Sequence, residues 1–337
     1  MMDEQDSIPT YHVLALSGGG YRGLYTATVL AGLESALGQP LARHFDLICG
    51  TSVGGLLAMG LALEIPTSDL QGIFKDHGGA IFDSRKGMRK LLGFWKMAKH
   101  SNEGLKHVLA PHFEGRTVGD LKHRTLVTSV NYATGAGQFF KTPHHPRFEL
   151  DHSMPLMDVA LATTAAPGYF PIVRNSRGVF ADGGLVGNAP GLFGWHEVVT
   201  FLEPSRSAKV RVLAIGTMST GATIRGDAKL DAGILDWRGD LLGLMFSAQE
   251  SSVNYMLGHI LGADYLKVDD AVTPQQSMDI RELDVVSEAA KQTLLARGAA
   301  AAQRTLGLAA FQPFRDHIAA QPGFFHGPNK NREIRRA

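Results

Sequence analysis

Residues 45–57 read FDLICGTSVGGLL: an apolar run, a serine between glycines, and a second apolar run that is compatible with a helix. Gly50 and Gly54 place Ser52 in the pattern G-x-S-x-G. Between a strand and a helix, this pattern predicts a sharp turn that exposes the serine hydroxyl, with glycines where a Cβ would clash. The start of the helix directs N–H groups and the positive end of its dipole toward a developing negative charge. Because short patterns recur by chance, a purely structural turn stays open at this point.

The composition is that of a soluble globular protein without an excess of basic charge. Of the 337 residues, 44% are apolar and 19% are charged, and 33 Lys and Arg balance 32 Asp and Glu. This balance does not favour a nucleic acid polymer as a partner. The single cysteine, Cys49, excludes an intramolecular disulfide and a zinc site built on several cysteines, and it fits a reducing compartment.

The sequence shows no targeting segment and no membrane-spanning segment. Residues 1–10 are polar and acidic, and they lack the basic and apolar regions of a signal peptide. No run of about 18 apolar residues occurs, so we expect a cytoplasmic protein whose membrane contact is peripheral. Residues 87–100 predict a basic amphipathic helix, with apolar residues at i, i+3, i+4 and i+7 from Met88. Such a helix packs on the core, contacts a membrane surface or forms a lid.

A glycine-rich loop precedes the serine turn. Residues 17–23 read SGGGYRG, and they join a short apolar run, 11–16, to a segment with helical spacing, 24–37. The loop satisfies G-x-G-x-x-G between a strand and a helix, which is the fingerprint of a dinucleotide-binding turn. The glycines of this pattern are Gly18, Gly20 and Gly23. A dinucleotide-binding protein is therefore one interpretation of the chain.

The second predicted strand favours another use of this loop. A dinucleotide site requires an acidic residue at the end of that strand to bind the ribose, but Asp46 stands at its beginning. The alternative is an oxyanion hole, in which consecutive backbone N–H groups face a developing negative charge. An oxyanion hole requires a nucleophile nearby, and the second strand leads directly to Ser52.

An aspartate followed by two glycines ends another apolar run. Residues 178–182 read GVFAD and predict a strand, and Gly183 and Gly184 follow it. Capping a turn is the commonest role of an aspartate in such a place. The glycines also leave one side of the Asp182 carboxylate open to another backbone or to a substrate. Because sites in α/β sheets form at the carboxyl ends of strands, we expect Asp182, Ser52 and the glycine-rich loop to converge there.

In this order, the glycine-rich loop, the serine turn and the aspartate with its two glycines resemble segments of the patatin-like phospholipase family, and a fourth similar segment precedes the aspartate. The similar segments are SGGGYRG at 17–23, GTSVGG at 50–55, AAPGYFP at 165–171 and DGG at 182–184. The resemblance covers roughly residues 11–220, the predicted catalytic core, and it implies a three-layer α/β/α sandwich with a mostly parallel central sheet. Ser17 departs from the family, which often has aspartate before the three glycines, and this puts in doubt only a contact that braces the loop.

The resemblance implies a lipid acyl hydrolase of the phospholipase A type that uses a Ser–Asp dyad. Ser52 would be the nucleophile and Asp182 the base, and burial is expected to raise the pKa of this carboxyl group. Arg22 would brace the loop or bind a lipid phosphate, with bracing favoured. The mechanism requires no metal and no other cofactor. The further positions are Gly18, Gly19, Gly20, Arg22 and Gly23 in the oxyanion hole, with the N–H of Val53 as an additional donor, Gly50 and Gly54 in the nucleophile elbow, and Gly183 and Gly184 beside the base.

A finer resemblance is to the phospholipase effectors of bacterial CBASS anti-phage systems. It is carried by LSGGGYRGLYTA at 16–27 and by the overall length. It implies activation by a cyclic dinucleotide and degradation of membrane phospholipids at the inner membrane surface, and it leaves a homo-oligomer open. Residues 221–320 are then a mainly helical part of the same domain that acts as a lid or a regulatory element, and residues 321–337 form a basic tail.

Three alternatives stay open from the residues alone. A Ser–His–Asp esterase of the α/β-hydrolase type would use His196 or His259, although neither follows a strand in a distinctive loop. A dinucleotide-binding protein would use the loop at 18–23, and a silent binding module would keep the scaffold without the chemistry. His144 and His145 are expected to be loop histidines and not a metal pair, because adjacent residues of an extended chain point to opposite faces.

Overall fold

The computed structural model describes residues 8–83, 97–204, 208–218, 231, 240–271, 279–280 and 282–330. Most of the predicted amphipathic helix at 87–100 lies outside these residues, and so do residues 331–337 of the predicted basic tail. Among the helices of the described segments, none is both long and apolar enough to cross a membrane.

A sheet of eight described strands forms the middle layer, with the order β5-β6-β3-β2-β1-β7-β8 and with β4 also paired to β3. The parallel strands are β1 (Thr10–Leu16), β2 (Leu47–Thr51), β3 (Thr125–Asn131), β7 (Lys209–Ile215) and β8 (Tyr265–Val268). The antiparallel strands are β4 (Gly137–Lys141), β5 (Val173–Asn175) and β6 (Gly178–Asp182). The central sheet is therefore mostly parallel, as predicted.

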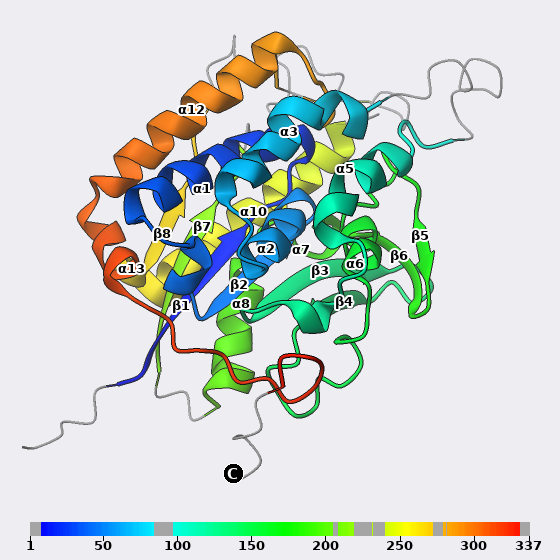
Figure 1. The fold of residues 1–337 in the computed structure, drawn as a ribbon. Coiled ribbons are helices and arrows are strands. Elements are labelled where there is room, and N and C mark those ends of the chain that lie inside the picture. The colour runs from blue at the N-terminus through cyan, green and yellow to red at the C-terminus, as the bar shows by residue number, and fades with distance from the viewer. Residues whose placement is uncertain are drawn as a thin grey trace, which may run out of the picture.

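Helices cover both faces of this sheet (Figure 1). One layer contains α1 (Gly23–Leu37), α2 (Val53–Ala62), α3 (Thr67–Ile81), α5 (Glu103–Phe113), α6 (Leu156–Thr163) and α12 (Glu288–Leu306). The other contains α8 (Gly191–Glu197), the π-helical turn η4 (Val198–Leu202) and α10 (Asp240–Leu261). Alternate strand residues face opposite layers, so Leu14 and Leu16 join the first core and Val13 and Ala15 the second. This arrangement confirms the predicted three-layer α/β/α sandwich.

Strand β6 differs from what a parallel sheet leads one to expect, because it runs antiparallel to β3. Its carboxyl end still reaches the edge where the parallel strands end, because β6 pairs only with the last residues of β3. Asp182 lies opposite Ser129, and the neighbouring Thr128 lies opposite Thr51 of β2. Asp182 therefore comes level with the end of β2, where Ser52 follows.

The described C-terminal segments share the sheet and one helical layer with the rest of the chain. Strand β8 pairs with β7 at the edge of the sheet, and α12 packs along α1. The two helices approach closely at Gly298, where a Cβ would lie 2.7 Å from the Cβ of Thr28. The boundary at residue 220 between a catalytic core and a C-terminal part stays a prediction.

Candidate active site

Ser52 occupies a tight turn between β2, which ends at Thr51, and α2, which begins at Val53. Its backbone has φ 53° and ψ −124°, a conformation that residues other than glycine rarely adopt. The N–H of Ser52 donates to the hydroxyl oxygen of Thr163 at 2.9 Å, which helps to hold the turn. Strained backbone of this kind is often found where a side chain is presented to a substrate.

Two glycines allow the chain to turn this sharply. A Cβ on Gly50 would lie 2.2 Å from the carbonyl oxygen of Gly54, and a Cβ on Gly54 would lie 2.2 Å from the carbonyl oxygen of Leu16. Any larger residue at either place would therefore push β1 and α2 away from the turn. The two positions predicted for a nucleophile elbow are thus positions where the backbone itself leaves no room for a side chain.

Asp182 reaches Ser52 at the end of β6. The hydroxyl of Ser52 donates to Oδ2 of Asp182 at 2.8 Å, and the N–H of Gly184 donates to Oδ1 at 2.6 Å. The Asp182 side chain is buried, and this burial raises its pKa to about 7, although both hydrogen bonds act in the opposite direction. Gly183 allows this approach, since a Cβ there would lie 2.1 Å from the hydroxyl oxygen of Thr128. The carboxyl group can therefore take up or release a proton near neutral pH.

The glycine-rich loop presents two free backbone donors. The N–H of Gly18 donates to the carbonyl oxygen of Asn188 at 3.0 Å, and the N–H of Gly23 bonds within the loop. The N–H groups of Gly19 and Gly20 have no acceptor among the described residues. Within the glycine-rich loop, Gly18 and Gly23 therefore shape the backbone, because their N–H groups are already used, and Gly19 and Gly20 remain as donors.

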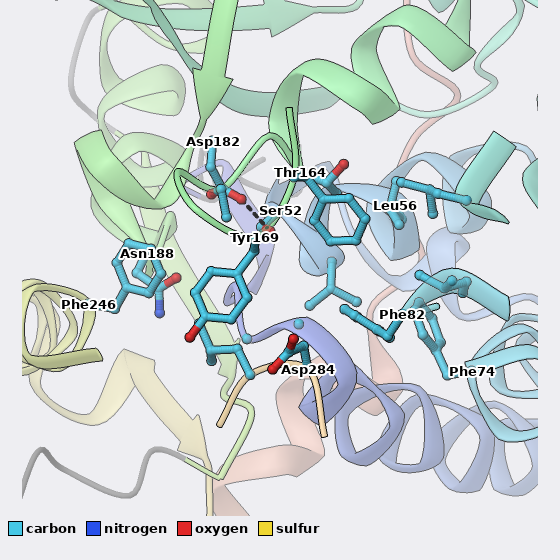
Figure 2. A pocket seen from close by; sticks show the side chains of 18 residues that line it. Ser52, Leu56, Phe74, Phe82, Thr164, Tyr169, Asp182, Asn188, Phe246 and Asp284 are labelled. Carbon is cyan, nitrogen blue, oxygen red and sulfur yellow. Dashed lines mark hydrogen bonds between the residues drawn. The ribbon is translucent and has the colours of Figure 1, made fainter. Parts of the chain in front are cut away.

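A mainly apolar cavity opens beside these groups (Figure 2). Ser52 and Asp182 line it together with the two free N–H donors. Most of the other lining side chains are hydrophobic and come from α2, α3, α5 and the loops that follow α3 and α6: Leu56, Phe74, Ile81, Phe82, Leu105 and Phe170. In Figure 2, Phe74 and Phe82 lie on one side of Ser52, and Phe246 of α10 lies on the other.

The comparison with known proteins places the chain in a family. A model of the family described as patatin-like phospholipase matches residues 14–192. The chain is also 66% identical over 324 residues to a protein of Pseudomonas aeruginosa strain BWHPSA011. The aligned part covers 96% of this chain and 97% of that protein. The chain belongs to the patatin-like phospholipase family. As a phospholipase of this family, it is a carboxylic-ester hydrolase.

Two further relatives show how far this similarity extends. A protein of Escherichia coli strain TW11681 is 33% identical over 320 residues, covering 86% of this chain and 88% of that protein. A protein of Vibrio cholerae serotype O1 is 39% identical over 226 residues, covering 61% of this chain and 64% of that protein. The three relatives carry the same name, cGAMP-activated phospholipase.

Arg22 of this patatin-like phospholipase points back along the glycine-rich loop. Its Nε donates to the carbonyl oxygen of Gly19 at 3.5 Å. A guanidinium group in this place steadies the peptide that joins Gly19 to Gly20, and both glycines line the cavity. The loop-bracing role, which was favoured over binding a lipid phosphate, stays a prediction.

The histidines of the alternative triad lie away from Ser52. His196 is exposed on α8, and His259 is exposed on α10, where its Nδ1 lies 2.8 Å from the carbonyl oxygen of Tyr255. No histidine is among the residues that line the described cavity. The dinucleotide interpretation fails as well, because Asp46 accepts hydrogen bonds from the backbone of His12 and from His317 at the opposite end of β2. Family membership supports a phospholipase and lends support to neither alternative.

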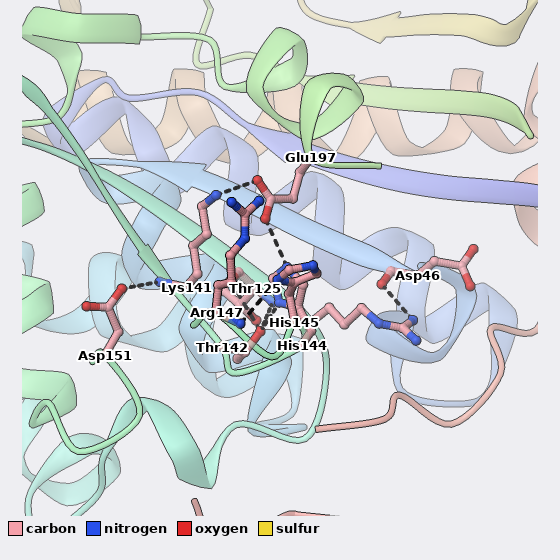
Figure 3. A network of polar contacts seen from close by, with 10 residues as sticks. Asp46, Thr125, Lys141, Thr142, His144, His145, Arg147, Asp151 and Glu197 are labelled. Carbon is pink, nitrogen blue, oxygen red and sulfur yellow. Dashed lines mark hydrogen bonds and ion pairs between the residues drawn. The ribbon is translucent and has the colours of Figure 1, made fainter. Parts of the chain in front are cut away.

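His144 belongs to a buried polar network at the start of β3 (Figure 3). Its Nδ1 lies 2.8 Å from the hydroxyl oxygen of Thr142, which accepts the N–H of Thr125. Its Nε2 lies 3.0 Å from Glu197 Oε1, and Lys141 donates to the other carboxylate oxygen at 2.6 Å. Burial lowers the pKa of His144, although Glu197 opposes this effect. The network joins β4 to α8 in the interior, so His144 is a structural residue and not half of a metal pair.

Sequence reasoning missed three residues that shape the site. Thr163 holds the serine turn, Asn188 holds the glycine-rich loop, and the carbonyl oxygen of Leu283 accepts the N–H of Tyr21 at 2.7 Å. Asn188 follows the Asp182 block closely in the chain, so its position was a usable signal. The other two lie far along the chain from their partners and are brought there only by the fold.

Proposed function

We propose that this chain hydrolyses an acyl ester bond of membrane phospholipids, with Ser52 as the nucleophile and Asp182 as the general base. The observation that carries the proposal is the 2.8 Å hydrogen bond from Ser52 Oγ to a buried carboxyl group beside an apolar cavity. A general base must lie within hydrogen-bond reach of the proton that it takes, and Asp182 meets this condition. Membership of the phospholipase family supports the same reaction.

The steps of the reaction follow from these contacts. Asp182 takes the proton of Ser52 as Oγ attacks the acyl carbonyl, and the N–H groups of Gly19 and Gly20 stabilise the negative oxygen. Val53 is the first residue of α2, so its N–H has no acceptor within the helix and serves as a third donor. The proton then passes from Asp182 to the departing alcohol oxygen. A water molecule, deprotonated by Asp182, attacks the acyl-enzyme, and its proton returns to Ser52 Oγ as the fatty acid leaves.

The cavity lining supports a long acyl chain as the group that is held beside Ser52. Aromatic and aliphatic side chains from α2, α3 and α5 surround the space next to the hydroxyl. Burial of apolar surface stabilises such a complex by about 25 cal/mol per Å². An acyl chain is the part of a phospholipid that fits these walls, whereas a charged head group would lose its hydration without a compensating partner.

The relatives support a cyclic dinucleotide as the activator of this hydrolysis. The Pseudomonas aeruginosa protein, which covers 96% of the present chain, is named a cGAMP-activated phospholipase. We extend this property to the present chain and infer that it degrades phospholipids of the inner membrane surface in defence against phage. Residues 221–320 then form the regulatory part through which the activator acts. A homo-oligomer is one state of the activated protein to test.

Release of fatty acid from phospholipid vesicles tests the proposal. With cGAMP present, we expect the wild-type protein to release fatty acid. Ser52→Ala and Asp182→Asn should each lower the rate by at least about a thousandfold while the circular dichroism spectrum is unchanged. Asp158→Asn is the matched control and should keep the wild-type rate. Burial raises the pKa of Asp158 too, but Asp158 does not line the cavity.

Two results would contradict separate parts of the proposal. Full activity of Asp182→Asn would exclude Asp182 as the base, because an amide cannot take the proton of Ser52. Equal rates with and without each of a panel of cyclic dinucleotides would exclude activation and would leave the hydrolysis itself intact. Chromatography of the protein by size, with and without the nucleotide, shows whether activation is accompanied by oligomerisation.

A further inference from the structure

A short strap from the C-terminal part of the chain lies against the glycine-rich loop. We use "strap" for residues 282–284, which precede α12. The carbonyl oxygen of Leu283 accepts the N–H of Tyr21 at 2.7 Å. The same oxygen lies so close to Gly20 that a Cβ there would be 2.1 Å from it, and Gly20 has φ 59°. The strap therefore holds the peptide next to the two free N–H donors.

Asp284 anchors the strap in the interior. Its side chain is 1% exposed, and it accepts hydrogen bonds from Lys99 Nζ at 2.7 Å and from His100 Nε2 at 2.5 Å. Burial alone would raise the pKa of Asp284, but the hydrogen bonds from His100 and Lys99 lower it overall, so the carboxylate is charged at neutral pH. The other ring nitrogen of His100 lies 3.2 Å from the carbonyl oxygen of Asp83, which completes the anchor.

The anchor also contacts residues of the loop that follows α6, two of which line the cavity. The N–H of Lys99 donates to the carbonyl oxygen of Gly168 at 2.9 Å, and the N–H of His100 donates to that of Tyr169 at 2.8 Å. The His100 ring packs against Phe170, with ring centroids 5.3 Å apart. Asp284 and Tyr169 both line the cavity (Figure 2). One buried carboxylate thus connects the glycine-rich loop to the loop that follows α6.

We propose that Asp284 is a positioning residue for catalysis: it keeps the Leu283 carbonyl on Tyr21 and so aims the N–H groups of Gly19 and Gly20 at the acyl oxygen. The inference rests on the proposed function, since it assigns a part to those two donors. A donor of this kind stabilises the transition state only when it lies at hydrogen-bond distance from the place where the negative charge develops. A strap that is free to shift would let the loop turn and would lower the rate of the chemical step.

This arrangement gives the C-terminal part of the chain a direct effect on the chemistry. The strap leads into α12, which packs along α1, the helix that follows the glycine-rich loop. A change in the C-terminal part that moves the strap would therefore alter the oxyanion donors without touching Ser52 or Asp182. Such a contact is what an activator bound away from the dyad would need in order to change the rate.

Kinetics with a soluble ester separate positioning from substrate binding. We expect Asp284→Asn, assayed with p-nitrophenyl butyrate and cGAMP, to lower kcat at least about tenfold and to leave KM within about twofold, because loss of one oxyanion donor costs 10²–10³ in kcat in a well-studied case and this loss is partial. The reaction of Ser52 with a fluorophosphonate, which forms a similar tetrahedral centre, should slow in parallel. Glu282→Gln is the matched control, since Glu282 is a partner of the same Lys99, at 3.5 Å, but is exposed. It should keep the wild-type kcat.

Each result has a definite meaning. A wild-type kcat in Asp284→Asn, a loss confined to KM, or an equal loss in Glu282→Gln would overturn the positioning role while leaving the Ser–Asp hydrolase in place. No hydrolysis by the wild-type protein under any condition would overturn the proposed function and this inference with it. If Asp284→Asn does not fold, Lys99→Gln serves instead, because Lys99 is partly exposed. That variant should lower kcat in the same way but less, and an unchanged kcat would again overturn the role.

Discussion

A carboxyl group acts as the base beside Ser52 in the proposed mechanism, although a carboxylate in water is a weak base with a pKa of about 3.9. The structure supplies the condition that makes it stronger. Asp182 is buried beside apolar side chains, and burial raises its pKa to about 7. Burial disfavours the charged form of Asp182, but it also brings the pKa of this carboxyl group near the working pH. A general base is most effective when its pKa is near that pH.

The rate should therefore depend on pH through Asp182. Only the ionised carboxylate can take the proton of Ser52, so we expect kcat/KM to rise about tenfold per pH unit below pH 7 and to level off above it, with a midpoint near the pKa of about 7. Hydrolysis of a soluble ester between pH 5 and pH 9 measures this profile. The Asp158→Asn variant should give the same curve. A flat profile across the whole range would show that no group with this pKa controls the reaction.

Stability should change with pH in the opposite direction. The pKa of Asp182 is higher in the folded state, at about 7, than the value of about 3.9 in an unfolded chain, so the protein loses stability as pH rises between these values. Asparagine does not titrate. We expect the free energy of unfolding of Asp182→Asn, relative to wild type, to increase by about 2 kcal/mol between pH 5.5 and pH 8.5.

Urea unfolding of both proteins at the two pH values measures this difference. A gap between Asp182→Asn and wild type that stays constant with pH would mean that the buried carboxyl group is not the source of the change. Because Asp182→Asn should abolish activity, a gain in its relative stability would show that the raised pKa of Asp182 serves activity at a cost in stability.

At the scale of elements, the packing of α12 on α1 ties the C-terminal part to the catalytic layers. At Gly298, a Cβ would lie 2.7 Å from the Cβ of Thr28 and 2.8 Å from the carbonyl oxygen of Tyr25. A helix glycine normally costs stability compared with alanine. At this position the small residue instead allows two helices to meet, and α1 in turn extends from the glycine-rich loop.

A pair of identical substitutions tests this contact. Gly298→Ala should lower the free energy of unfolding by about 1–3 kcal/mol, because the new methyl group overlaps α1. Gly258→Ala, in α10, has nothing within 4 Å of the added Cβ and should be neutral or should stabilise by up to about 1 kcal/mol. Thermal unfolding of both variants gives the comparison. Equal stability of the two would show that the helices separate easily at this point.

At the scale of the whole molecule, the sandwich is completed by segments that follow residue 220. Strand β8 covers the edge of β7, and α12 covers part of α1 in the helical layer that contains α2. Buried residues of both segments, such as Leu266 and Leu294, belong to the same core as Leu14 of β1. We therefore propose that the predicted catalytic core and the C-terminal part fold as one unit.

Truncation tests this proposal. A chain that ends at Met218 would expose the edge of β7 and the face of α1, so we expect it to be insoluble or to lack cooperative thermal unfolding. A chain that ends at Lys330 removes only the end of the predicted basic tail and should keep the melting temperature of the full chain to within about 2 °C. Cooperative unfolding of the chain that ends at Met218 would instead support a separate catalytic domain at residues 11–220.

The sequence by itself determined the fold class and the residues that the proposed dyad uses. The apolar runs, the glycine-rich loop and the turns at Ser52 and Asp182 are local patterns, because the backbone conformation of a turn depends on the residues within it. Their order along the chain was enough to indicate the family. Ser52 and Asp182 could be named before any distance was known.

Only the tertiary structure decided how these pieces are used. Two of the predicted oxyanion donors, Gly18 and Gly23, already donate their N–H groups within the protein, and the first of these bonds joins residues 170 positions apart. The antiparallel direction of β6 and the pKa of Asp182 also depend on neighbours that are distant in sequence. The sequence could not predict the contact of the strap at 282–284, because every residue has the same backbone carbonyl oxygen. Hydrogen bonds and burial between remote segments exist only in the folded chain, and there they select which groups are free to react.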